Sequence, residues 1–228
     1  MSTGHDHRQS NIANVTIMEA RMYVPPAFRE TDLPFIHETM RAAGLANLVT
    51  ATASGLTCTP MPLFLNEREG DMGTLYGHVA KANPQWKEQP VGEALAIFMG
   101  PDAYVTPSWY AGKSRDGKVV PTWNYVAVHA YGPVEFFDDA DRLLEVVTRL
   151  TNLHEASRPE PWAVGDAPPD FIQAQLRGIV GVRLPITRID AKRKMSQNRN
   201  AEDRAGVKEG LSRSTDARDR QAAALIRE

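Results

Sequence analysis

The sequence predicts a mainly β protein with added helices, an α+β class in which the strands form a closed or partly closed barrel. Several runs of strand length are separated by turn residues between positions 45 and 137, and this spacing favours a barrel. The run EALAIFMG at residues 93–100 is almost continuously apolar, which is typical of a central strand buried on both faces. After Phe137 the apolar spacing becomes that of a helix, so helices accompany the strands.

The composition is that of an ordinary globular protein. Of 228 residues, 42% are hydrophobic and 24% are charged, which is enough for one large domain. A formal charge of −2 gives no overall basic field to attract nucleic acid or a membrane surface. The single cysteine excludes an internal disulfide and a cysteine-based zinc site. No apolar run reaches membrane-spanning length, and the first twenty residues lack the apolar core of a secretory signal. These features predict a cytoplasmic protein.

Three segments are expected along the chain. Residues 1–21 are polar and without periodicity, which predicts a disordered leader. Residues 22–199 contain the expected strands and the helices inserted among them. Residues 200–228 are rich in charge and predict a helical extension that is mostly exposed.

The first elements are a helix and a hairpin. Residues 31–44 predict a helix, because Thr31 or Asp32 can cap its start and Gly44 can end it. The runs at 45–53 and 56–66 flank Ser54 and Gly55, which predict a tight turn between two strands.

The second strand of this hairpin contains two prolines and the cysteine. Pro60 and Pro62 cannot donate a backbone hydrogen bond to a neighbouring strand, so they indicate an edge strand, a bulge or a backbone contact with a ligand. Cys58 follows an apolar strand pattern, and we expect it to be buried and not nucleophilic.

The later elements follow from their periodicity and their caps. Alternating residues predict strands, and the spacing of Leu143, Val146 and Leu150 predicts a helix capped by Asp138 or Asp139. Strands are expected at 74–80, 93–100, 123–137 and 179–190, a short helix or turn at 83–89, a long loop or irregular hairpin at 101–125, and helices at 138–155, 168–178, 201–211 and 216–228.

The segment GHVAKANPQW, residues 77–86, carries the first candidate site. His78, Lys81 and Asn83 fall within six positions where a strand is expected to end. A lysine beside the backbone amides of a starting helix can hold a phosphate, and His78 can bond the same group. An ordinary surface lysine, a structural histidine and a helix cap by Asn83 remain the alternatives.

The strand VPTWNYVAVHAYG, residues 120–132, carries the second. A period of two places Trp123, Tyr125, His129 and Tyr131 on one face and mainly aliphatic residues with Asn124 on the other. Rings with polar tips that share a face favour contact with a flat ligand or a second subunit over plain core packing.

The segment KRKMSQNR, residues 192–199, is the third. Its basic, hydroxyl and amide groups suit a second patch that faces phosphate or DNA, although a solvated basic turn is the alternative. The residues of interest are Lys194, Ser196, Gln197 and Asn198. No catalytic motif of the serine hydrolase, zinc protease or P-loop type occurs, so no catalytic residue and no metal ligand is assigned.

These motifs together resemble the PaiB family of FMN-binding transcriptional regulators. The resemblance runs from MYVPPAF at residue 22 to KMSQNR at residue 199 and on into the terminal helices, and it includes AIFMGPDAYVTPSWY and VVPTWNYVAVHAYG. It implies an FMN-binding split β-barrel with peripheral helices. It also implies a homodimer that holds FMN at or near its interface.

The resemblance extends to individual residues. It implies that Lys81 binds the FMN phosphate, that the strand with Trp123, Asn124 and Tyr125 lines the flavin cleft, and that His129 faces the cofactor. Pro60 to Leu63 would approach the ring through backbone atoms. For Lys194, Ser196 and Gln197 it supports a place near the cofactor without a defined role.

Three functions remain open from the sequence. The first is an FMN-binding negative transcriptional regulator that contacts DNA directly or through a partner. The second is an FMN-dependent oxidoreductase of the pyridoxamine-phosphate-oxidase-like class. The third is a barrel that binds another flat ligand such as haem, with His78 and His129 as the candidate axial ligands, or that binds none.

Overall fold

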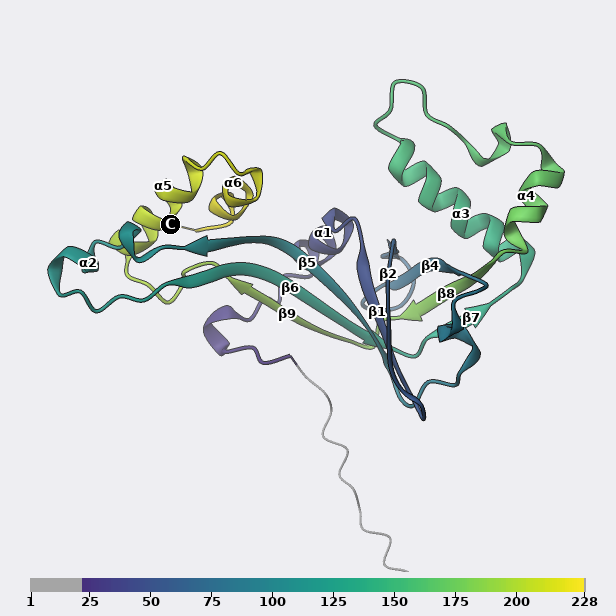
Figure 1. Ribbon diagram of the computed structural model, residues 1–228, viewed down its shortest axis with the longest axis horizontal. Coiled ribbons are helices and arrows are strands. Elements are labelled where there is room, and N and C mark those ends of the chain that lie inside the picture. The colour runs from purple at the N-terminus through teal and green to yellow at the C-terminus, as the bar shows by residue number, and fades with distance from the viewer. Residues whose placement is uncertain (1–21, 228) are drawn as a thin grey trace, which may run out of the picture.

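The computed structural model describes residues 22–227, whose strands form two antiparallel sheets (Figure 1). The five-stranded sheet has the order β2 (Gly55–Met61), β1 (Ala46–Thr52), β5 (Ala94–Val105), β6 (Thr122–Gly132) and β9 (Arg188–Lys194). The four-stranded sheet has the order β3 (Phe64–Asn66), β4 (Thr74–Ala80), β8 (Ile179–Pro185) and β7 (Glu135–Phe137). The expected leader, residues 1–21, lies outside the described residues.

Helices surround the sheets. The α-helices are α1 (Leu33–Ala42), α2 (Gly112–Arg115), α3 (Ala140–Glu155), α4 (Pro169–Leu176), α5 (Ala201–Ser212) and α6 (Ala217–Ala224). The short 3₁₀ helices are η1 (Pro26–Phe28), η2 (Pro84–Lys87), η3 (Pro107–Trp109) and η4 (Val164–Asp166). None of the helices in the described part of the chain has both the length and the apolarity to cross a membrane.

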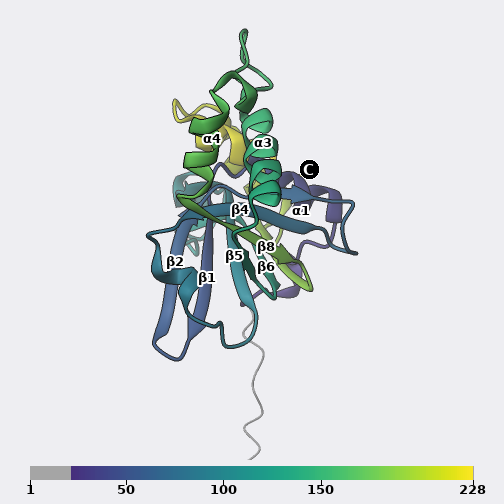
Figure 2. The ribbon, with the colours of Figure 1, turned by 90° about the vertical axis from the view of Figure 1, so that its right-hand side faces the viewer.

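The main core lies between the two sheets. Leu48, Phe98 and Val128 of the five-stranded sheet pack with Leu75 and Val182 of the four-stranded sheet, and all five are almost completely buried. Figure 2 shows α3 and α4 on the far side of the four-stranded sheet from β1 and β5. The predicted split β-barrel with peripheral helices is confirmed.

Strands β5 and β6 continue past the barrel as a long hairpin, on which α5 and α6 lie (Figure 1). We call residues 101–125 and 192–227 the hairpin lobe. A second core joins this hairpin to the terminal helices, and its residues include Val105, Val126, Met195, Leu211 and Ala223. The expected terminal helices are therefore present, and each buries one face.

Local sequence signals place several elements correctly. Asp32 precedes α1 as its N-cap residue, and Asp139 accepts a hydrogen bond from the backbone of Arg142 at the start of α3. Residues 53 and 54 connect β1 to β2, which is an edge strand, as Pro60 within it predicts.

Two long runs that alternation predicts as single strands are each divided between the sheets. Residues 123–137 form β6 and β7, and residues 179–190 form β8 and β9. A proline stands at each break, Pro133 directly after β6 and Pro185 at the end of β8. Neither has an amide hydrogen to donate to a neighbouring strand. A Cβ at Gly132 would also collide with the carbonyl of Pro185, so this crossing point requires glycine.

Two burial predictions are wrong. Cys58 is exposed on β2, because Thr57 and Thr59 on either side of it are the residues that turn inward. Strand β5 is central, as expected, but only one of its faces is fully buried, and Met99 on the other face is 48% exposed.

Candidate functional site

The ten predicted site residues fall into three groups. His78, Lys81 and Asn83 lie on β4 and the turn after it. Trp123, Tyr125 and His129 share one face of β6, and Asn124, Lys194, Ser196 and Gln197 meet where β9 ends. Among the described residues, no hydrogen bond, ion pair or ring contact joins the first group to the other two.

Lys81 is an exposed cation held at a fixed turn. Its amide donates to the carbonyl of Gly178 at 2.8 Å, and its own carbonyl accepts from the Trp86 indole at 3.1 Å. Its Nζ lies 3.9 Å from a carboxylate oxygen of Asp138, a loose pair of exposed side chains. Such a pair contributes little in water, so Lys81 can turn to another anion.

Asn83 works within the protein and caps η2. Its side-chain oxygen accepts from the amide of Gln85 at 2.9 Å, and its Nδ2 donates to Thr59 at 2.9 Å. The buried amide of Gln85 donates to the carbonyl of Leu48 and to the hydroxyl of Thr50, both at 3.1 Å. Sequence analysis did not single out Gln85, although it belongs to the same motif. The side-chain amides of Asn83 and Gln85 therefore hold the turn that carries Lys81 against the β1–β2 hairpin.

His78 lies on the face of β4 that α3 and α4 cover. Its register partner is Gly181, where a Cβ would collide with the ring of Phe137. The Nδ1 atom is buried and has no hydrogen-bond partner among the described residues. Burial lowers the pKa of His78, since desolvation disfavours the charged imidazolium.

His78 should make the protein less stable in mild acid. The unfolded chain takes up the proton near the ordinary pKa of 6.5, whereas the folded protein takes it up at a lower pH. The free energy of unfolding therefore falls as the pH drops below this value, until the pH passes the folded-state pKa. As the pH falls, the free energy of unfolding measured with urea should decrease less for His78→Gln than for the wild type. Equal losses would contradict this role.

Trp123, Tyr125 and His129 lie on what we call the outer face of the five-stranded sheet, the face turned away from the main core. Trp123 is 52% exposed and meets the edge of Tyr104 with ring centroids 5.9 Å apart. Burial, partly offset by Asp190, lowers the pKa of His129, which favours its neutral imidazole. The predicted division of β6 into a ring-bearing face and an aliphatic face is confirmed.

The same face carries apolar residues that no core covers. Val49, Leu95 and Ile97 are half-buried and belong to none of the apolar clusters formed by the described residues. Two cations, Lys192 and Lys194, lie near the Tyr125 ring at 5.2 and 6.0 Å from its centroid. The outer face therefore combines apolar surface, aromatic rings and positive charge.

The third group connects the start of β6 with the tight turn after β9. Asn124 and Ser196 are almost fully buried and bond each other reciprocally at 3.1 and 3.2 Å. Gln197 bonds the backbone of Met195 and Arg193 and so holds the turn itself. Asn124 thus faces away from Trp123 and Tyr125, its neighbours in sequence.

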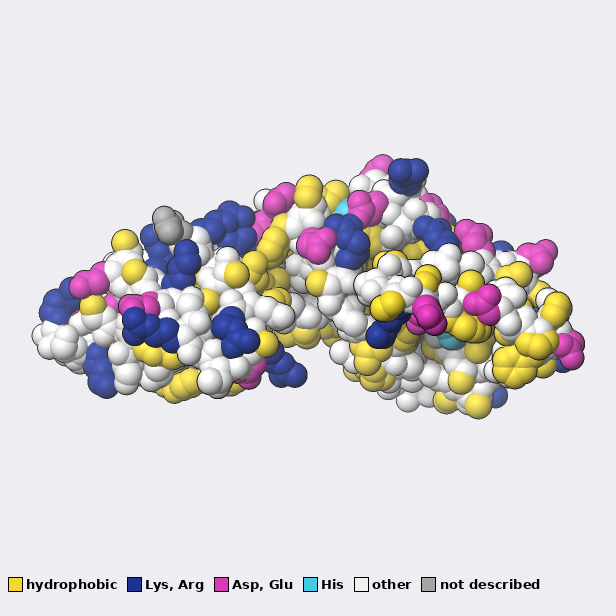
Figure 3. Space-filling view, turned by 90° about the horizontal axis from the view of Figure 1, so that it is seen from above, with side chains coloured by type: hydrophobic (Ala, Val, Ile, Leu, Met, Phe, Trp, Pro, Cys, Tyr) yellow, Lys and Arg dark blue, Asp and Glu magenta, His cyan; other side chains and the backbone are white. Residues whose placement is uncertain are grey.

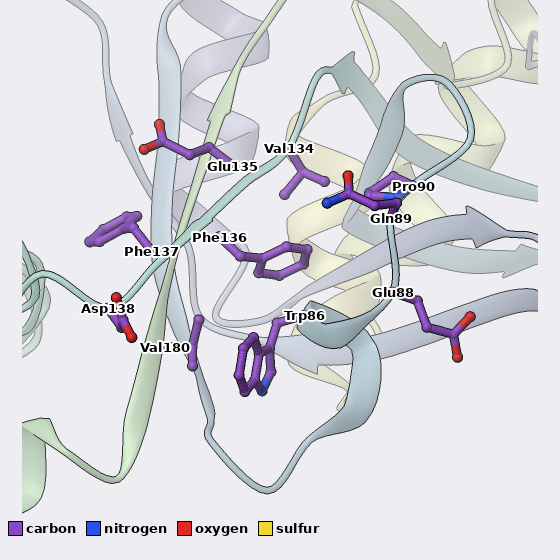
Figure 4. A pocket seen from close by; sticks show the side chains of 10 residues that line it. All are labelled: Trp86, Glu88, Gln89, Pro90, Val134, Glu135, Phe136, Phe137, Asp138 and Val180. Atoms are coloured by element: carbon purple, nitrogen blue, oxygen red, sulfur yellow. The ribbon is translucent and has the colours of Figure 1, made fainter.

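A separate cleft of about 480 Å³ lies in the barrel, between the segment after η2 and β7 (Figure 4). Trp86, Phe136 and Val180 come together in its middle. Its edge carries the carboxylates of Glu88, Glu135 and Asp138. Arg142 bonds Glu135 at 2.7 Å, and the Lys81 Nζ lies 3.9 Å from Asp138. The cleft thus has apolar walls, and two of the three carboxylates at its edge are paired with cations.

Comparison with known proteins decides the family. Residues 22–188 match the family described as "Putative FMN-binding domain". The chain is 34% identical to protease synthase and sporulation protein PAI 2 of Bacillus subtilis over 206 residues, which cover 90% of this chain and 96% of the relative. The chain belongs to the PaiB family. It is a flavoprotein whose cofactor is FMN.

A further relative shares the sequence, and two solved structures share the fold. An uncharacterized protein of Aspergillus fumigatus is 34% identical, covering 84% of this chain and 91% of its own. The fold is similar to an FAD- and haem-binding protein of Mycobacterium smegmatis, with a TM-score of 0.55 and 13% identity over 78% of each chain. It is also similar to the flavocytochrome Anf3 of Azotobacter vinelandii, with a TM-score of 0.53 and 17% identity over 78% of this chain and 75% of the other. At these identities the similarity concerns the fold.

The outer face of this PaiB-family protein offers a surface that suits a flavin ring. A flavin ring needs aromatic or apolar cover and its phosphate needs cations. The outer face offers the rings of Trp123 and Tyr125, with Lys194 beside the Tyr125 ring. Tyr104, which sequence analysis did not single out, extends this surface, because pairing with β6 places it opposite Trp123.

Proposed function

We propose that this PaiB-family protein is a cytoplasmic negative transcriptional regulator that acts as a homodimer with FMN at the dimer interface. One observation supports this most directly: the outer face of the five-stranded sheet leaves Ile97 and its apolar neighbours without cover. A second copy of the chain can bury that surface, since stable dimers bury about 1,200–2,000 Å² in total.

The chain's own residues account for binding FMN. Trp123 and Tyr125 would cover the ring, and Lys81 would hold the phosphate by a charge-assisted bond. Bound FMN supplies a redox-active ring that accepts electrons from a reductant. Burial of the interface would exclude water from the ring. His129, whose neutral form is favoured by burial, would present a hydrogen-bonding nitrogen to the ring without adding charge.

The distribution of charge supports contact with DNA. Residues 101–125 and 192–227 contain 13 lysines and arginines against 7 acidic residues, whereas the other described residues contain 11 against 18. Figure 3 shows Lys and Arg side chains gathered over the end of the molecule that the hairpin and terminal helices form. Arg213, Arg218 and Arg220 are exposed there. By contrast, Lys192 and Arg193 of the basic segment are buried in β9.

A single preparation separates the candidate functions. The FMN-loaded protein should bind duplex DNA of its own promoter at physiological salt, and the variant with Arg218→Gln and Arg220→Gln should bind more weakly and with a shallower salt dependence. Rapid bleaching of the flavin by NADPH without oxygen, with no DNA binding, would instead favour the oxidoreductase. A Soret band in place of flavin absorbance would favour haem.

Replacing Lys81 with alanine should weaken FMN binding. The lost charge-assisted contact corresponds to about 1.5–3 kcal/mol, or roughly 10- to 150-fold in the dissociation constant. Flavin fluorescence titration measures this, and riboflavin, which lacks the phosphate, should bind both proteins equally. Lys87→Ala is the matched control, because Lys87 is an exposed lysine of the same segment. Equal FMN affinity for Lys81→Ala and the wild type would refute the phosphate assignment.

A further inference from the structure

A small hollow in the hairpin lobe is lined only by side chains that can donate hydrogen bonds. It measures about 30 Å³ and lies between the start of β6 and the turn after β9. The lining residues are Thr122, Asn124, Lys194, Ser196, Asn198 and Arg199. All are hydroxyl, amide or cationic residues, and none is acidic or apolar. This lining suits an oxyanion and does not suit a cation or a hydrocarbon.

The two cations of the hollow have no carboxylate partner among the described residues. Lys194 donates to the Thr122 hydroxyl at 2.5 Å and to the carbonyl of Trp123, which leaves one of its three N–H groups. Arg199 lies over the Tyr110 ring, 4.7 Å from its centroid. Burial lowers the pKa of Lys194, and the charges of Lys192 and Arg199 lower it further. A bound anion would reverse this repulsion.

The turn that builds the hollow is held in a strained conformation. Ser196 has a φ of +63°, and it is the one non-glycine residue in the described part of the chain with a positive φ. A left-handed serine persists only where its surroundings impose it. Here the reciprocal bonds with Asn124 and the bonds of Gln197 to the backbone impose it. The donors are thus fixed before any ligand arrives.

We propose that this hollow is a binding site for a terminal phosphate group, separate from Lys81. A space of this size admits about one oxygen-sized group, and the other phosphate oxygens would remain at the mouth, beside Lys194 and Arg199. A terminal phosphate can project an oxygen into such a recess more freely than a diester backbone can. The site goes beyond the proposed function, because FMN binding through Lys81 does not require it. The phosphate belongs either to FMN or to a second small ligand.

Inorganic phosphate is the probe that tests the site. On the riboflavin-loaded protein, in which no flavin phosphate can fill the hollow, inorganic phosphate should raise the melting temperature over chloride at equal ionic strength by about 2–4 °C. Lys194→Met and Arg199→Gln should each abolish this rise. Lys118→Met should keep it, because Lys118 is an exposed lysine of the same lobe and lies outside the hollow. An undiminished rise in both hollow variants, or an equal loss in the control, would overturn the proposal.

Flavin titrations of the same variants show whether the hollow binds the phosphate of FMN or that of a second ligand. A loss of FMN affinity of about tenfold or more without loss of riboflavin affinity would assign the hollow to the FMN phosphate. Unchanged FMN affinity with a lost phosphate effect would assign it to a second ligand. Both outcomes support the site. Neither depends on Lys81→Ala, so failure of the Lys81 assignment and failure of this site remain distinguishable.

Discussion

Replacing Ile97 with arginine should separate the dimer into monomers and deprive them of FMN. Ile97 lies on the central strand β5, where its register partners are Asn47 and His129. An arginine here would place an unpaired charge in the middle of the proposed interface. The dimer should weaken by about 3 kcal/mol or more, which is more than 100-fold in its dissociation constant. FMN should be lost with it, because the interface encloses the flavin. Light scattering after size exclusion measures the mass, and flavin absorbance measures the FMN content.

The substitution should leave the fold intact, which makes the result interpretable. Ile97 belongs to none of the apolar clusters of the described chain, so the main core does not depend on it. Circular dichroism should be unchanged. Leu153→Arg is the matched control, since Leu153 is a 50% exposed leucine on α3, away from the five-stranded sheet. A stable FMN-loaded dimer of the Ile97→Arg protein would place the interface elsewhere.

Sequence periodicity predicted the helices and strands that are determined by residues close to one another in the chain. Strand β4 and helix α3 were found because their apolar spacing and the cap at Asp139 are properties of neighbouring residues. The division of residues 123–137 and 179–190 between two sheets was missed, since alternation continues through each break. Which sheet a strand joins depends on partners far away in the sequence, such as the pairing of β8 with β4.

The site was predictable as a set of donors but not as an arrangement. The motif around Lys81 indicated polar groups in the right place. It could not show that Asn83 bonds Thr59, because that partner is 24 residues distant and belongs to another strand. Cys58 was misplaced for the same reason. The hydroxyl of Thr59 beside it turns inward and donates to Gln85, whose amide also donates to the backbone carbonyl of Thr57. This reverses the face that apolarity alone would bury.

Replacing Gly206 with alanine should destabilise the hairpin lobe. A Cβ at Gly206 of α5 would collide with the backbone carbonyl of Trp109 in η3, and backbone cannot move aside as a flexible side chain can. In a free helix the same change would stabilise by about 1 kcal/mol. Here we expect the free energy of unfolding to fall by about 2 kcal/mol, because the helix must shift away from the second core. Urea unfolding followed by tryptophan fluorescence measures the loss.

The consequences should be local, because α5 covers the end of the hairpin and the barrel does not require it. Its displacement removes Val207 and Leu211 from the second core and frees the turn of Ser196. The phosphate response of the hollow should therefore disappear while the barrel stays folded. Gly165→Ala provides the control: its Cβ would meet no atom within 4 Å, so stability should stay within about 0.5 kcal/mol of the wild type. A stabilised Gly206→Ala protein would mean that helix propensity outweighs the collision, and that α5 is not held against Trp109.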